Sequence, residues 1–395
     1  MGLLRVLFIT LLLVFYPLGE ITRITFGEAA VTLIDITTGL IVFVWLFTKI
    51  SSGEKLCGKL LKPIVIFISI LALSLIFNST KLNPTQIAVS ASYILRWGMY
   101  ASMYFVVKDL DFNFKKGLPY FMLASGFLII IGGFIQYFIY PDLRNLYYLG
   151  WDEHLYRMFS SFLDPNFAGA FFVLYFLFVL VFFQKIKLKN YRYVLITILI
   201  LSLVSILLTF SRSAYIMFFV GVLSLMSIKK QRKLFFLIVI FSVGIFLTSK
   251  MVFKSEGTNL LRTASGNARL DSIGNAVVIF KDNPIFGVGF NSYRYAQKRY
   301  GFINEDKRLI HSGAGTDNSF LFILATTGIV GFLGFLYLLY KIFNLANRMI
   351  KKNQYALILF VSILSLGVNS FFVNSLFFPS LMLWVWILAG LTEST

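Results

Sequence analysis

The sequence predicts an all-α polytopic membrane protein of about 12 transmembrane helices, with a long extracytoplasmic loop that contains short amphipathic helices. Hydrophobic residues make up 58% of the 395 residues and charged residues only 13%, well below the roughly 25% of a soluble domain. The apolar runs are long and unbroken, whereas the strands of a transmembrane barrel would alternate over about ten residues. Residues 1–395 are therefore treated as a single integral membrane domain.

Twelve apolar segments reach or approach the length of about 20 residues that crosses a bilayer. The first resembles a signal peptide, but no small-x-small cleavage site follows it, so it is kept as an uncleaved anchor. The expected spans are 3–18, 29–48, 63–78, 86–107, 118–140, 166–184, 193–210, 213–228, 233–249, 317–340, 354–374 and 376–392.

Lysine and arginine set the expected orientation, because cytoplasmic connections carry the excess of positive charge. With the N-terminus inside, the most basic connections all fall on one side, and both termini are cytoplasmic: these are 49–62, 108–116, 185–192, 229–233 and 341–352. The net charge of +19 is then explained by topology and anionic lipid, which removes nucleic acid as a partner. The only cysteine, Cys57, has no partner for a disulfide or a metal-binding motif, so neither metal nor cofactor is expected.

The predicted outer face carries two sizeable connections, 141–165 and 250–316, the latter between the ninth and tenth spans. A third connection is only the short turn 210–213, which sets Arg212 at the outer surface. A guanidinium at this position can bind a diphosphate through two parallel hydrogen bonds. The alternative is a charge that snorkels at a helix end.

Two further arginines are candidate diphosphate ligands. Arg96 lies in the middle of a span, where a charge costs at least about 2.5 kcal/mol and faces a cavity or a partner; the alternative is an internal pair with Asp35. Arg269 precedes an amphipathic helix expected over 272–280, lying on the membrane. It is either a second phosphate contact or a charge neutralised by Asp271.

His311 and Asp317 are the candidate proton acceptors, because histidine moves protons near neutral pH and an aspartate at a helix start can act as a base or orient one. The alternatives are an exposed loop histidine and a helix cap, and the neighbouring Asn318 is either a substrate contact or part of that cap. Asp164 and Asn166 flank a proline at a helix start and are candidate contacts to a sugar or phosphate.

Four short phrases carry a family resemblance by their order and their place on the predicted outer face: Ser161 to Ala168, Leu208 to Ser213, Arg269 with Asp282 to Phe290, and Asp317 to Leu321 with Thr327 to Gly331. Together they resemble the O-antigen ligase and polymerase family of bacterial envelope proteins, which share the Wzy-C type region. The resemblance covers about residues 155–335 by motif and the whole chain by topology.

The resemblance implies a metal-independent glycosyltransferase in the bacterial cytoplasmic (inner) membrane, with its active site outside. Such proteins transfer a glycan from undecaprenyl diphosphate to an acceptor hydroxyl, so the implied partners are a lipid-linked oligosaccharide, an acceptor glycan and the bilayer, with a chain-length regulator as a further candidate. Arg212 and Arg269 carry over by motif position as diphosphate ligands. A loop histidine would activate the acceptor.

One departure from the family pattern bears on the type of enzyme. Ligases tend to have His-Asn-x-x-Leu where this chain has Asp317-Asn318-Ser319-Phe320-Leu321. The base is therefore either Asp317 or His311, and the departure favours a polymerase over a ligase that joins glycan to the lipid A core. A lipid-linked oligosaccharide flippase is the rival from another class, but it should place charges along several spans and show related halves.

Overall fold

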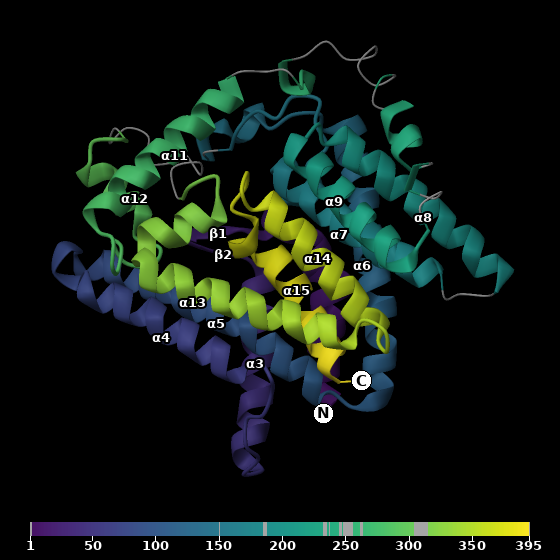
Figure 1. Ribbon diagram of the computed structural model, residues 1–395, viewed down its shortest axis with the longest axis horizontal. Coiled ribbons are helices and arrows are strands. Elements are labelled where there is room, and N and C mark those ends of the chain that lie inside the picture. Colours follow the sequence, from purple (N-terminus) through teal and green to yellow (C-terminus); the bar gives the residue numbers. More distant parts are fainter. Residues whose placement is uncertain are drawn as a thin grey trace.

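The computed structural model describes residues 2–149, 151–184, 188–231, 235–236, 238–244, 247, 256–260, 264–303 and 315–394. Within these residues the chain is all-helical except for one two-stranded hairpin (Figure 1). Its first half contains α1 (Gly2–Thr10), η1 (Leu11–Phe15), α2 (Tyr16–Leu18), η2 (Gly19–Thr22), β1 (Ile24–Phe26), β2 (Ala29–Val31), α3 (Leu33–Ser51), α4 (Leu61–Phe77), η3 (Ser79–Lys81), α5 (Pro84–Asp109), α6 (Phe112–Ile139), η4 (Arg144–Leu149), η5 (Ser160–Phe162) and α7 (Pro165–Phe183). The second half contains α8 (Lys189–Leu208), α9 (Arg212–Lys229), η6 (Glu256–Thr258), α11 (Ala264–Asp282), α12 (Tyr293–Arg299), α13 (Ser319–Met349), α14 (Gln354–Asn369), η9 (Ser375–Phe377) and α15 (Pro379–Glu393).

Among the described helices, seven are long and apolar enough to cross a membrane, and α4, α14 and α15 are apolar but shorter. Eleven of the expected spans coincide with a described helix, while 233–249 is described only at residues 235–236, 238–244 and 247. The second expected span began too early. Residues 29–31 pair with β1 as strand β2, and α3 begins only after Thr32 and Asp35 close a capping box.

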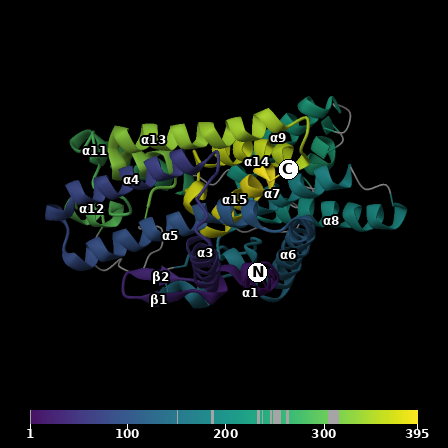
Figure 2. The same ribbon diagram turned by 90° about the horizontal axis from the view of Figure 1, so that it is seen from below.

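Two helices form the centre of the molecule. Helices α7 and α15 are apolar on all sides and almost entirely buried, as expected for helices surrounded by other helices rather than by lipid. Figure 2 shows α5 and α15 between α13 on one side and the hairpin on the other. Close approach of α15 to α5 depends on Gly390, where a Cβ would stand 2.7 Å from Val107.

The glycine-rich phrase Asp282 to Phe290 joins α11 to a kink in α13. The amide of Ile329 donates to the Pro284 carbonyl at 2.8 Å, and the amide of Gly289 donates to the Thr326 carbonyl at 2.9 Å. These bonds are possible because Gly328 leaves the helical conformation, with φ 66° and ψ −165°. The phrase is therefore a structural clamp that fixes the position of α11 on α13.

Helix α11 differs from the amphipathic helix expected over 272–280. It starts at Ala264, and it packs against α13, burying Ala276 and Ile279 completely or nearly so. Part of its apolar face is thus covered by protein, where the sequence predicted contact with lipid. Because α11 is docked on α13, its first turns lie beside the N-terminus of that helix.

Contacts between connections follow the alternation that the basic residues predict. Arg5 forms an ion pair with Asp111 at 2.9 Å, and Glu393 accepts a hydrogen bond from the Lys59 amide at 3.2 Å, so connections assigned to one side touch each other. On the other side, Lys81 donates to Asn283 at 3.1 Å. The chain ends also lie at the same edge of the molecule in Figure 1.

Candidate functional site

A polar cavity of about 650 Å³ collects most of the residues that sequence reasoning selected. Arg96, Asp164, Asn166, Arg269 and Asp317 all line it. They come from α5, the start of α7, the start of α11 and the residues before α13. Segments far apart in the chain therefore meet at one site.

Arg269 and Asp317 meet because α11 runs past the residues that precede α13. The Asp317 amide donates to the hydroxyl of Ser272, one turn after Arg269, at 3.4 Å. Burial raises the pKa of the Asp317 carboxyl above its usual value, and the guanidinium of Arg269 lowers that pKa. Asp317 keeps accessible surface within the cavity, so this carboxyl is both reachable and electrostatically perturbed.

Two neighbouring carboxylates also raise the pKa of Asp317. Asp164 and Asp152 each raise the pKa of Asp317, because a like charge disfavours the ionised carboxyl. Burial and Asp164 likewise raise the pKa of Asp152. The cavity thus brings carboxylates together with arginines, and perturbed groups in a cleft are typical of functional sites.

Arg212 is brought close to this cavity by the turn that precedes α9. Ser211 caps α9 by accepting from the Ala214 amide, and its hydroxyl donates to the Asn166 side chain at 2.9 Å. Burial and the positive charge of Arg212 both lower the pKa of the Arg269 guanidinium, which places the two cations within electrostatic range. Arg212 also donates to the Leu260 carbonyl at 3.4 Å.

Asp164 and Asn166 hold the start of α7. The Asp164 carboxylate accepts from the Asn166 amide at 2.6 Å and serves as the N-cap before Pro165. The Asn166 carbonyl oxygen accepts from Ser211. Both side chains nevertheless line the cavity, so capping and contact with a ligand are compatible at these positions.

Asn318 has the capping role that was the alternative to substrate binding. Its side-chain oxygen accepts from the amides of Phe320 and Leu321 at 2.8 and 3.0 Å, and its amide group donates to the Phe371 carbonyl. These bonds use both ends of the side chain, which is 8% exposed. Asn318 therefore fixes the position of the preceding Asp317.

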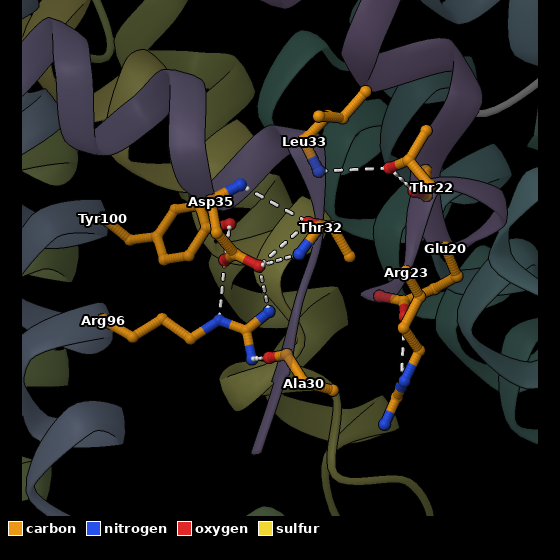
Figure 3. Close-up of polar contacts among 10 residues, drawn as sticks. Glu20, Thr22, Arg23, Ala30, Thr32, Leu33, Asp35, Arg96 and Tyr100 are labelled. Carbon is orange, nitrogen blue, oxygen red and sulfur yellow. Dashed lines mark hydrogen bonds and ion pairs between the residues drawn. The ribbon is translucent and has the colours of Figure 1, made fainter. Parts of the chain in front are cut away.

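Arg96 forms the internal pair with Asp35 that was its alternative assignment (Figure 3). Two of its nitrogens bind the two carboxylate oxygens at 2.6 and 2.5 Å, and a third donates to the Ala30 carbonyl. Tyr100 and Thr32 donate to the same carboxylate. This network connects α5 to the start of α3. Arg96 lines the cavity while its guanidinium remains bonded to Asp35 and Ala30.

The cavity is also lined by titratable residues that the sequence analysis did not select: Glu20, Arg23, Asp152, His154 and Arg157. Arg157 is 6% exposed, and its Nε donates to the Thr209 carbonyl at 2.9 Å, beside the turn that carries Arg212. The signal that could have found it is its place in the outer connection 141–165. His311 lies outside the described residues.

Apolar helices around a polar cavity define a multi-pass membrane protein with a buried charged site. Residues 197–336 match the family model described as O-Antigen ligase, and this match supports the resemblance to the O-antigen ligase and polymerase family that the four phrases carry. Members of this family are enzymes that act on lipid-linked glycans. A search of curated proteins found no match. The matched region includes Arg212, Arg269 and Asp317, whereas Asp164 and Arg96 come from outside it.

Proposed function

We propose that this protein is a polymerase that joins glycan repeat units carried on undecaprenyl diphosphate, on the outer face of the bacterial cytoplasmic membrane. The observation that carries the proposal is the meeting of Arg269 with Asp317 at one cavity, within electrostatic range of Arg212. A transfer from a diphosphate-linked sugar needs cations for the leaving group and a base for the acceptor, and these residues supply both.

In the proposed reaction, the acceptor hydroxyl oxygen attacks the anomeric carbon of the donor sugar. A new glycosidic bond forms, the bond from that carbon to the diphosphate oxygen breaks, and the bonding electrons leave with the diphosphate. The acceptor proton passes to Asp317 or His311. Arg269 and Arg212 stabilise the charge that develops on the leaving oxygen, because preorganised cations act most strongly where charge appears in the transition state.

The remaining site residues take supporting roles. Asp164 and Asn166 contact the sugar or its phosphate from the start of α7, where both line the cavity. Arg96 shapes the wall through its pair with Asp35 and is not needed as a direct phosphate ligand. Asn318 orients Asp317. The described residues 264–303 of the predicted outer connection contribute Arg269 to the site, and both termini are on the cytoplasmic side.

The alternative within the family is ligation of the glycan to the lipid A core. Purified protein incubated with lipid-linked repeat units alone separates the two, because only a polymerase can use a second repeat unit as acceptor. A ladder of products supports the polymerase. Transfer that appears only after lipid A core is added would assign the ligase instead.

A further inference from the structure

A second and larger cavity adjoins the polar one. Its volume is about 1360 Å³, and most of its accessible wall is apolar. The N-terminal helices contribute Leu13, Val14 and Leu18, and α6 contributes Leu128, Ile131 and Ile135. A cavity with this lining suits a long hydrocarbon chain.

The two cavities share part of their walls. Glu20, Arg23, Tyr93 and Trp151 line both. A ligand with an apolar chain and an anionic head that lay across both cavities would have its chain-to-head junction at this shared wall. Arg23 is the only arginine or lysine that lines both of them among the described residues.

Arg23 is held in place without using all of its donors. Its Nη1 pairs with Glu20 at 3.2 Å, and its guanidinium lies 5.7 Å from the centre of the Trp151 ring (Figure 3 shows the Glu20 pair). Its Nε is buried and has no hydrogen-bond partner within the described part of the chain. The accessible 27% of the Arg23 side chain therefore belongs to its other atoms, and these can meet an anionic group in the cavity.

Arg96 is less available than Arg23 to bind an anionic head group. Arg96 has two nitrogens on Asp35 and a third on Ala30, which completes its planar fork. Arg23 has one ion pair, to Glu20, and part of its side chain remains accessible. Glu20, which is 6% exposed, fixes the direction of the Arg23 side chain.

We propose that Arg23 binds the diphosphate of a polyprenyl diphosphate whose chain occupies the larger cavity. This inference rests on the proposed function and deepens it, because it assigns the place where the lipid ends and the reacting head begins. Arg23 would hold the phosphate nearer the lipid. Arg269 and Arg212 would then act on the phosphate that is attached to the sugar.

The test measures binding to the full-length purified protein with three probes: a C55 polyprenyl diphosphate, inorganic pyrophosphate and phosphatidylglycerol vesicles. Arg23→Ala should raise the Kd for the polyprenyl diphosphate at least tenfold. Inorganic pyrophosphate should bind weakly to all variants, because it lacks the chain. Equal competition by phosphatidylglycerol would overturn the proposal and indicate a general lipid contact.

A paired variant separates ligand binding from a structural role. Arg23→Ala leaves Glu20 buried without its cation, so the variant is also made with Glu20→Gln, which removes that charge. If Arg23 binds the diphosphate, the double variant folds and still binds weakly. Wild-type affinity in the double variant would show that Arg23 serves only to neutralise Glu20 and would overturn the proposal.

Arg299, at the end of α12, is the matched control because it lines neither cavity. Arg299→Ala should leave the Kd unchanged; equal losses of affinity in Arg299→Ala and Arg23→Ala would show a nonspecific effect of removing a positive charge and contradict the proposal. Failure of this inference differs from failure of the proposed function. If Arg269→Ala stops transfer while Arg23→Ala keeps a wild-type KM, only the role of Arg23 is lost. If wild-type protein performs no transfer, the proposed function itself fails.

Discussion

Arg269 and Asp317 line the same cavity, close enough for the guanidinium to lower a carboxyl pKa that burial raises. This relationship depends on a packing arrangement. The clamp between Asp282 and Phe290 docks α11 on the kink of α13, and Asn318 fixes the chain just before that helix. These contacts hold both residues of the proposed cation and base pair in place.

Removing the leaving-group cation should slow transfer without unfolding the protein. Arg269→Ala is expected to lower kcat by roughly a hundredfold, as for loss of one electrostatic contact in a transition state. Arg269→Lys keeps the charge but loses the bidentate fork, so its activity should fall in between. Product formation from lipid-linked repeat units measures both. The exposed Arg299 on α12 provides the control, since Arg299→Ala should be active; equal losses in both variants would contradict the assigned role.

Arg212 should act together with Arg269. The two cations are within electrostatic range, so we expect both to bind the same diphosphate. Arg212→Ala is expected to cost a similar factor, and the double variant should lose less than the product of the two single losses, since residues that act as a unit are not additive. Strictly multiplicative losses in the double-mutant cycle would mean that the two arginines act at separate places.

The pH dependence of kcat/KM tests Asp317 as the base. A base works only when deprotonated, and the pKa of Asp317 is raised, so the acid limb should lie above the pH of about 3.9 at which an ordinary aspartate titrates. Asp152→Asn removes a negative charge that raises this pKa, and the acid limb should therefore move to lower pH. Three results together would show that His311 is the base instead. The acid limb would not move in Asp152→Asn, His311→Gln would lose activity, and Asp317→Asn would keep normal activity.

The clamp should be sensitive to one methyl group. Gly287 has φ +62°, and a Cβ there would stand 2.3 Å from the backbone of Thr326. Gly287→Ala should lower the free energy of unfolding by more than the roughly 1–2 kcal/mol of a left-handed residue, because the clash adds to the strain. Gly274→Ala on α11 is the control, since no atom lies within 4 Å of the added Cβ. A similar Tm for both variants would contradict the clamp.

The Arg96 and Asp35 pair should prove structural. Arg96→Ala leaves a carboxylate that is 4% exposed without its cation and should cost about 3–5 kcal/mol. Replacing both residues, with Arg96→Leu and Asp35→Leu, should restore much of the Tm. If this double variant is stable but cannot bind the lipid-linked donor, Arg96 contacts the substrate directly after all.

Much of the fold followed from the apolar spans, because hydrophobic length is a strong local signal. The caps at Asp164 and Asn318 could also be anticipated, since short polar side chains before an apolar run start helices. The clamp at Gly287 could not, because it depends on contacts with a distant segment, and the hairpin at residues 24–31 could not, because each of its strands is only three residues long. Arg23 and Arg157 were overlooked for the same reason: only packing reveals that an ordinary loop arginine lines a cavity.

The most direct measurement is product analysis after wild-type protein, purified and reconstituted, is given lipid-linked repeat units with no other acceptor. The account predicts a ladder of longer lipid-linked glycans, with one polyprenyl diphosphate released for each unit added and no ladder in the Arg269→Ala variant. Unchanged repeat units, under conditions in which the protein remains folded, would contradict it.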